Sequence, residues 1–232
     1  MDQLAGEPAQ AALFLDVDGV LAPIVPRPED ARVPEDTRAE LRRLHARYAL
    51  VACISGRTGN DAQRIVGVPE LTYVGNHGLE LEPSATEWAT RLHSFLATVD
   101  WPQVEDKGLT AALHFRNVAD ETTTRAELDD IAARAQRAGF IARYGRKVLE
   151  LVPPLEANKG TAVRRLLDER GLRRALYAGD DTTDLDAFAV LEQIELGIRV
   201  AVLSKEGPSE LRSMADLALQ SPADVLRLLR RL

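Results

Sequence analysis

The chain has 232 residues, of which 45% are hydrophobic and 28% charged, a balance typical of a globular protein with one or two domains. Its formal net charge of −7 argues against a nucleic-acid partner, because phosphate backbones select basic surfaces. The single cysteine, Cys53, excludes an internal disulfide and is expected to be a core residue of the apolar segment "ALVACI".

The opening segment, "MDQLAGEPAQ", lacks the basic and apolar regions of a signal peptide. No apolar run of the sequence is long enough to span a bilayer. We therefore expect no membrane partner and a cytoplasmic location. We also expect a monomer, and a loose tail over the first ten residues.

The first third of the chain predicts strands that alternate with helices. The strands show little internal alternation of polar and apolar residues, as in buried parallel βα units. The proline-rich segment between the first strand and the first helix predicts a loop. We expect strands at 13–16, 50–54 and 71–74, helices at 35–48 and 59–66, and the loop at 22–34.

The middle of the chain has a different pattern. A helix with several apolar residues and a long polar helix alternate with two short strand pairs, each pair split by glycine, which predicts a small α+β unit. We expect helices at 84–99 and 121–138, and hairpins at 103–115 and 140–152, the second turning at Gly145-Arg146.

The βα pattern then returns, with helices at 159–170, 184–191 and after Ser221-Pro222, and strands at 174–178 and 197–203. The two flanking parts therefore predict one α/β fold, a Rossmann-like doubly wound parallel sheet interrupted by an insertion. We expect a catalytic core at 11–81 and 155–232, and an inserted α+β cap, which would provide substrate specificity, at 82–154.

Four polar motifs lie where predicted strands end or helices begin: "DVDG" at 16–19, "SGR" at 55–57, "NKG" at 158–160 and "GDDTTD" at 179–184. Ligands of an open α/β sheet bind outside the carboxyl ends of its strands. If the strands are parallel, the strand-end motifs gather at one edge, and Lys159 joins them from the start of its helix.

The predicted site is rich in carboxylates, namely Asp16, Asp18, Asp180, Asp181 and Asp184. They cannot all ionise close together without a compensating charge, and a hard cation with oxygen ligands supplies one. Mg²⁺ is the expected cofactor, because it binds one or two carboxylates together with phosphate oxygens. Lys159, Ser55 and Gly56 suit the phosphate, and a remaining carboxylate is a workable nucleophile toward phosphorus.

The four motifs, in this order, resemble those of the haloacid dehalogenase-like superfamily of phosphotransferases. The long interval between Ser55 and Lys159 is similar to that of members whose cap lies between the second and third motifs. More narrowly, the chain resembles the trehalose-6-phosphate phosphatase family. The segments that carry this resemblance are "FLDVDGVLAPIVPRPEDARVPEDT", "GNHGLELEP", "LHFRN", "VLELVPP", "NKGTAV" and "GDDTTDLDAF".

The resemblance implies roles for the motif residues. Asp16 is expected to form an aspartyl-phosphate, while Asp18 protonates the departing sugar oxygen and then deprotonates the attacking water. Asp16, the backbone carbonyl of Asp18 and Asp180 are expected to bind Mg²⁺, with Asp181 ligating directly or through water. Asp184 is expected either to lie behind the metal ligands or to be a helix N-terminal acid.

Another set of side chains is expected to recognise the sugar, namely Arg57, Asn76, His77, His114, Arg116 and Glu150. The hydroxyl groups of a disaccharide need donors and acceptors in fixed geometry, and the resemblance implies that the insertion supplies part of them. His114 and Arg116 share one face of a strand. Taken singly, each of the two also fits a solvated sheet face, and Arg57 also fits a phosphate contact or a surface ion pair.

The expected reaction is Mg²⁺-dependent hydrolysis of a small-molecule sugar phosphate, trehalose 6-phosphate, to trehalose and phosphate. Three positions depart from the family pattern: Val20 replaces threonine, Leu185 replaces glutamate, and Val152 replaces a frequent arginine. Val152 keeps sucrose phosphate, mannosyl-glycerate phosphate or a hexose phosphate open as the substrate. A phosphomutase, which also forms an aspartyl-phosphate, and a non-catalytic sugar-phosphate sensor stay open as well.

Overall fold

The computed structural model describes residues 1–115, 121–145, 147–204 and 207–232. Its contacts divide the chain into two compact units. The larger, which we call the core unit, consists of Met1–Gly78 and Ala157–Leu232, and the smaller, the inserted unit, consists of Leu79–Glu156. The inserted unit therefore interrupts the sequence of the core unit.

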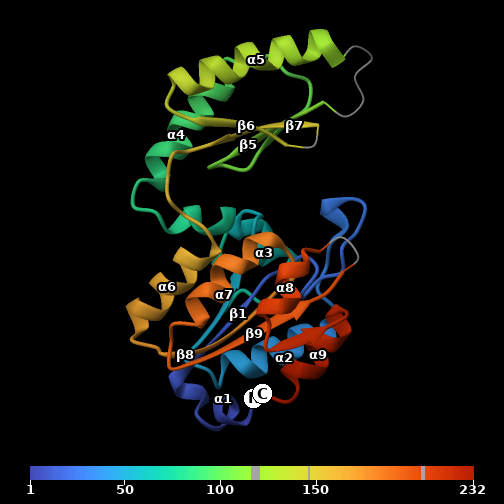
Figure 1. The fold of residues 1–232 in the computed structure, drawn as a ribbon, viewed down its shortest axis with the longest axis vertical. Coiled ribbons are helices and arrows are strands. Elements are labelled where there is room, and N and C mark those ends of the chain that lie inside the picture. Colours follow the sequence, from blue (N-terminus) through green and yellow to red (C-terminus); the bar gives the residue numbers. More distant parts are fainter. Residues whose placement is uncertain (116–120, 146, 205–206) are drawn as a thin grey trace. The chain divides into compact units, whose positions relative to one another are not determined.

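Six parallel strands form the sheet of the core unit, in the order β10–β9–β8–β1–β2–β3 (Figure 1). The chain starts this sheet in its middle and builds outward first on one side and then on the other. The point of reversal is β1, which β2 and β8 flank. The strands are β1 (Ala11–Leu15), β2 (Leu50–Ile54), β3 (Thr72–Val74), β8 (Arg174–Gly179), β9 (Leu196–Val202) and β10 (Leu217–Leu219).

Helices cover both faces of this sheet, which explains why its central strands are apolar throughout. Leu13 of β1 shares a buried cluster with Leu41, Ile65 and Leu228 of three helices on one face. Tyr177 of β8 points to the other face and meets a helical phenylalanine edge to face. The helices are α1 (Asp2–Gly6), α2 (Glu35–His45), α3 (Gly59–Val66), α6 (Lys159–Arg170), α7 (Leu185–Leu191), α8 (Ser209–Met214) and α9 (Pro222–Leu229).

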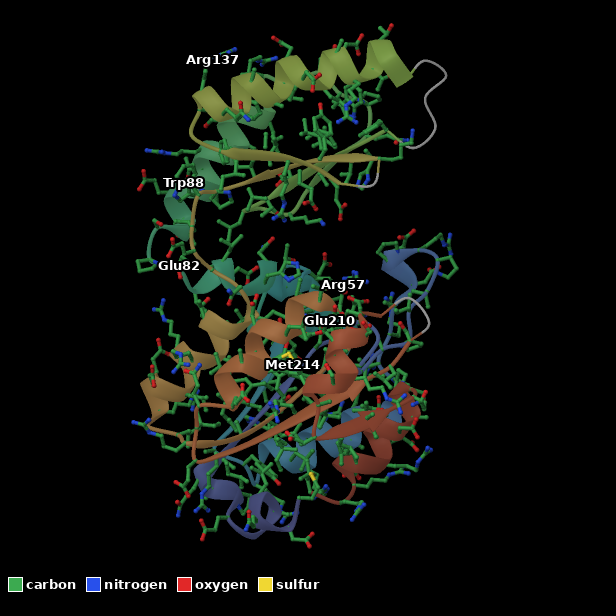
Figure 2. The ribbon with its side chains drawn as sticks, viewed as in Figure 1. Arg57, Glu82, Trp88, Arg137, Glu210 and Met214 are labelled. Atoms are coloured by element: carbon green, nitrogen blue, oxygen red, sulfur yellow. The ribbon has the colours of Figure 1, made fainter. Side chains whose placement is uncertain are left out.

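The inserted unit is an antiparallel sheet in the order β4–β5–β7–β6 with two helices on one face (Figure 1). Leu113 and Leu149 of the sheet are buried together with Leu92 and Leu128 of the helices. In Figure 2, Trp88 marks the first of these helices and Arg137 the end of the second. The elements are α4 (Ala85–Leu96), β4 (Val104–Asp106), β5 (Ala111–His114), α5 (Glu121–Arg137), β6 (Ile141–Gly145) and β7 (Val148–Val152).

The predicted fold class, a doubly wound parallel sheet with an inserted α+β unit, is confirmed. The prediction of a loose tail over the first ten residues is wrong. Asp2–Gly6 is helical, and Leu4 has no exposed surface because it packs into the core cluster. The short elements α8 and β10 were not expected from the sequence. Within the described residues, none of the helices is both long and apolar enough to cross a membrane.

Candidate active site

Three of the four motifs follow neighbouring strands at the same edge of the core sheet. Asp16 comes directly after β1, Ser55 after β2, and Asp180 after β8. Because β2 and β8 both pair with β1 in parallel, the carboxyl ends of the three strands lie side by side. This is the edge at which α/β proteins bind ligands.

Lys159 reaches the strand ends from the first residue of α6. The Asn158 side chain caps this helix by accepting a hydrogen bond of 2.8 Å from the Thr161 N–H. Lys159 is 2% exposed, and its ammonium donates to Asp16 Oδ2 at 2.5 Å and to Asp184 Oδ1 at 2.7 Å. It is therefore a buried partner of two carboxylates, and a solvated lysine at a helix start is excluded.

Glycine at position 160 allows the start of α6 to approach α7 closely. A Cβ at Gly160 would lie 2.5 Å from the backbone oxygen of Asp186, a separation that atoms cannot adopt. The "NKG" motif thus combines a helix cap, a charged side chain and a close packing point in three consecutive residues. Its local sequence explains how a lysine can be held inside the core.

Asp184 is the most completely bonded side chain of the site. It is fully buried, and its Oδ1 accepts from the Lys159 ammonium and, at 2.7 Å, from the Tyr177 hydroxyl. Its Oδ2 accepts from the backbone N–H groups of Asp180 and Asp181, both at 2.9 Å. A carboxylate has about four lone-pair positions, so protein donors use all of them. Asp184 therefore organises the loop and the lysine, which fits the expected position behind the metal ligands.

Asp16, Asp180 and Asp184 form the one group of potential metal-ligating side chains found among the described residues, with carboxylate oxygens within 4.8 Å of one another. In that part of the chain, we find no hydrogen-bond donor to the Asp180 carboxylate, so its lone pairs remain available. A Cβ at Gly19 would lie 2.0 Å from Asp180 Oδ2, which shows how closely the "DVDG" turn approaches this carboxylate. Oxygen donors of this kind fit a hard divalent cation such as Mg²⁺.

Asp181 and the side chain of Asp18 lie outside that carboxylate group. Asp181 is exposed, and its Oδ1 accepts a hydrogen bond of 2.6 Å from the Thr182 N–H. The roles of Asp181 and of the Asp18 carbonyl as metal ligands remain predictions.

Burial makes the carboxyl groups of Asp16 and Asp180 weaker acids than an exposed aspartate. Burial raises the pKa of Asp16 to about 7, although the charge of Lys159 opposes the shift. Burial also raises the pKa of Asp180 to about 8, and the charges of Asp16 and Asp184 add to that effect. A cation bound between the carboxylates would restore their ionised forms.

Asp18 is engaged by an arginine of the "SGR" motif. Arg57 Nε donates to Asp18 Oδ2 at 2.6 Å, and Arg57 Nη2 donates to Oδ1 at 2.8 Å, a bidentate pair. Gly19, which follows Asp18, has a φ of +75°, so the chain turns sharply there at no steric cost. Arg57, which Figure 2 labels, therefore fixes the orientation of the predicted acid and base.

The "SGR" loop rests on a strained turn that follows β3. The N–H of Asn76 donates to the Arg57 carbonyl at 2.7 Å, and the N–H of His77 donates to the Ser55 carbonyl at 2.9 Å. Asn76 and His77 have φ values of 50° and 55°, which side-chain-bearing residues rarely adopt. A Cβ at Gly56 would lie 2.6 Å from the His77 ring. Two of the expected sugar ligands, Asn76 and His77, thus lie against the expected phosphate loop.

Ser55 and Asn76 are both buried, whereas His77 is exposed. Ser55 Oγ accepts a hydrogen bond of 3.2 Å from the Arg57 N–H, which orders the loop around it. Ser55, Gly56, Asn76 and His77 therefore form one connected group at the strand ends. Their roles in binding phosphate or sugar remain predictions.

The inserted unit exposes a polar row on the sheet face that the helices leave open. Strand register places Glu105, Ala112, Glu150 and Arg143 opposite one another across four strands. Arg143 Nε donates to Glu150 Oε2 at 2.8 Å. A separate contact of 3.0 Å joins His114 Nε2 to Glu105 Oε2. Two of the expected sugar ligands, His114 and Glu150, thus share this face, while Arg116 lies outside the described residues.

The sequence motifs did not identify three polar residues, one beside the buried Asp184 and two on the open sheet face of the inserted unit. Tyr177 lies inside a strand and matches none of the motifs. Glu105 and Arg143 resemble ordinary surface charges, and only the pairing of four strands places them beside Glu150 and His114. No local signal in the sequence fixes that register.

Comparison with known proteins decides the family. The family model of trehalose-phosphatase matches residues 14–223. The chain belongs to the trehalose-phosphatase family. The expected resemblance to the trehalose-6-phosphate phosphatase family is therefore confirmed, and this family is one of phosphoric monoester hydrolases.

Several curated relatives align with nearly the whole chain. It is 34% identical over 259 residues to trehalose-phosphate phosphatase of Mycobacterium avium, covering 100% of this chain and 63% of that protein. It is 31% identical over 261 residues to trehalose 6-phosphate phosphatase RA3 of Zea mays, covering 98% and 71%. A third relative, an uncharacterized glycosyl hydrolase of Mycobacterium tuberculosis, is 35% identical, and the chain spans only 18% of it. The chain thus spans a part of each relative.

Solved structures support the same fold. A trehalose-6-phosphate phosphatase related protein superposes with a TM-score of 0.71 at 22% identity, covering 95% of this chain and 96% of that one. A haloacid dehalogenase-like hydrolase from Bacteroides thetaiotaomicron gives a TM-score of 0.60 at 16% identity, covering 95% and 98%. Because the sequence identities are low, these structures support the fold alone.

Proposed function

We propose that this protein hydrolyses trehalose 6-phosphate to trehalose and inorganic phosphate, through an aspartyl-phosphate and with the aid of Mg²⁺. The observation that carries the proposal is the contact of Lys159 with Asp16 beside the Asp180 carboxylate, at the sheet edge where ligands bind. The family of the chain and the names of its relatives support the substrate.

Asp16 is the proposed nucleophile, because its carboxylate lies at the end of the central strand and faces the cationic end of Lys159. Its oxygen would attack phosphorus while the bond from phosphorus to the sugar oxygen breaks. Lys159 would hold the phosphate oxygens in place, together with the Ser55 hydroxyl and the N–H groups around Gly56. The Asp16–Asp180 pair would hold Mg²⁺, whose charge offsets that of the carboxylates and the phosphate.

Asp18 is the proposed acid and base. It would give its proton to the departing sugar oxygen and then take a proton from the water that attacks phosphorus and releases Asp16. Arg57 pairs with both oxygens of Asp18, so it would have to loosen its hold before Asp18 carries a proton. Arg57 is therefore proposed to control when Asp18 reacts.

The open sheet face of the inserted unit is proposed to contact the sugar. Its carboxylates, histidine and arginine can accept and donate hydrogen bonds to hydroxyl groups, as carbohydrate recognition requires. Glu105 and Arg143 join the expected His114 and Glu150 in this role. Val152 lies opposite the exposed Ile141 on the same face, which adds an apolar border beside the polar row.

The test is phosphate release from a panel of sugar phosphates, with and without Mg²⁺, by the wild type and by Asp16→Asn. Release confined to trehalose 6-phosphate, and lost with chelator and in the variant, would support the substrate and the chemistry. Release from other sugar phosphates alone would refute the substrate. Transfer of phosphate between sugar positions would indicate a mutase, and tight binding without release would indicate a sensor.

A further inference from the structure

Tyr177 is a buried polar residue beside the predicted phosphate-binding lysine that none of the motifs includes. It lies inside β8 with no exposed surface. Its ring meets Phe188 of α7 edge to face, with centroids 6.1 Å apart. Its hydroxyl donates a hydrogen bond of 2.7 Å to Asp184 Oδ1.

The same oxygen, Asp184 Oδ1, also accepts from the Lys159 ammonium at 2.7 Å. The other oxygen of Asp184 is held by two backbone N–H groups of the loop after β8. The carboxylate is therefore fixed on every side, and Tyr177 is its only uncharged side-chain donor among the described residues. The Lys159 ammonium and the Tyr177 hydroxyl donate to the same oxygen. By holding that oxygen in place, the hydroxyl influences the position of the ammonium.

The surroundings of the hydroxyl argue against a purely space-filling role. A phenylalanine would fill the same apolar volume next to Phe188 without carrying a group that must be desolvated. A tyrosine hydroxyl is protonated at neutral pH, and an ionised carboxylate can only accept, so the hydrogen bond runs from Tyr177 to Asp184. The hydroxyl is thus a permanent donor aimed at one carboxylate oxygen.

We infer that Tyr177 is a positioning residue for phosphate binding: its hydroxyl orients Asp184, and Asp184 holds the Lys159 ammonium beside Asp16. This inference rests on the proposed function, because it assigns the phosphate site to Lys159. It adds a link from the interior of a strand to the group that is proposed to bind the phosphate.

The test compares Tyr177→Phe with a matched control, Tyr73→Phe. Tyr73 of β3 belongs to the same sheet and donates a hydrogen bond of 2.7 Å to the Val68 carbonyl, outside this network. With trehalose 6-phosphate, kcat/KM of Tyr177→Phe should fall about tenfold or more, the factor for one lost hydrogen bond to a charged group. The control should remain within about twofold of the wild type, well below that factor.

A second readout does not depend on turnover. Inorganic phosphate with Mg²⁺ should raise the Tm of the wild type and of Tyr73→Phe by the same increment, and that of Tyr177→Phe by less. A purely structural tyrosine would lower Tm in the absence of phosphate and leave the increment unchanged. The Asp184→Asn variant extends the comparison. In that background, adding Tyr177→Phe should reduce the phosphate-induced increase in Tm little further, because the hydroxyl acts through Asp184.

The two ideas fail in different ways. A wild type that releases no phosphate from trehalose 6-phosphate, yet is stabilised by inorganic phosphate through Tyr177, would refute the proposed function and keep the positioning role. Equal phosphate increments for Tyr177→Phe and Tyr73→Phe would overturn the positioning role. A wild type that phosphate does not stabilise would overturn it as well. If Asp184→Asn does not fold, the phosphate-induced increases in Tm of Tyr177→Phe and Tyr73→Phe alone decide whether Tyr177 is a positioning residue.

Discussion

Replacing Lys159 by methionine should destabilise the metal-free core unit severely. The change removes one charge from between two buried carboxylates, Asp16 at 2.5 Å and Asp184 at 2.7 Å, while it keeps most of the side-chain volume. At an effective dielectric constant near 20, one such attraction is about 6 kcal/mol. Desolvation offsets much of it, and breaking a buried ion pair by removing one partner costs about 3–5 kcal/mol.

The assay is urea unfolding and thermal unfolding, both followed by circular dichroism, at pH 7.5 with chelator. Arg165→Met is the matched control, because it removes one positive charge from the same helix at an exposed ion pair with Glu169. That pair contributes about 0.3–0.5 kcal/mol. A loss of 3–5 kcal/mol corresponds to a fall in Tm of about 10–15 °C for Lys159→Met.

The pH dependence sharpens this test. Because the pKa of Asp16 is about 7, this carboxyl is largely protonated at pH 5, and fewer uncompensated charges remain for Lys159 to offset. The cost of Lys159→Met should therefore be smaller at pH 5 than at pH 7.5. A cost equal to that of Arg165→Met at pH 7.5 would refute the idea that the lysine neutralises buried carboxylates.

Two further predictions concern the carboxylates and the turn beside them. Stability of the metal-free protein should fall as pH rises from about 4 to 8, because Asp16 and Asp180, with pKa values of about 7 and about 8, bind protons more tightly in the folded chain than in the unfolded chain. Thermal unfolding across that range with chelator measures this, and stability that rises with pH throughout would contradict it. Gly19→Ala should abolish most of the rise in Tm that Mg²⁺ causes in the wild type, because the new Cβ would lie 2.0 Å from Asp180 Oδ2 and the backbone there has a φ of +75°. A full Mg²⁺ effect in Gly19→Ala would show that Asp180 does not ligate the ion.

Much of the fold follows from local patterns in the sequence. The apolar run of β2 and the cap residues of α6 mark those elements directly: Asn158 caps the start of α6, and Gly171 ends it in the left-handed conformation. The hairpins of the inserted unit also follow from pairs of short strand runs that are separated by glycine. These signals are local because each depends on residues that are neighbours in the chain.

The missed elements depend on contacts that local patterns do not contain. α1 has only five residues and is stabilised by the burial of Leu4 in the core cluster, whose other members come from distant parts of the chain. β10 has three residues, and its place at the edge of the sheet comes from pairing with β9. In the site, the motifs located Asp16, Lys159 and Asp180, but the donors around Asp184 come from β8, α6 and the following loop together.

The turn through Gly78 is the last part of the core chain before the insertion begins. Gly78 has a φ of +105°, and a Cβ there would lie 2.6 Å from the backbone oxygen of Asn158. The outgoing and returning segments of the core chain are therefore in contact where the insertion begins and ends. In topological terms the insertion is a single long loop with adjoining ends, so it can change in length and sequence without altering the register of any core strand. Asn158 thus both lies against the Gly78 turn and caps the helix that carries Lys159, so the start of this helix is fixed where the core chain resumes after the insertion.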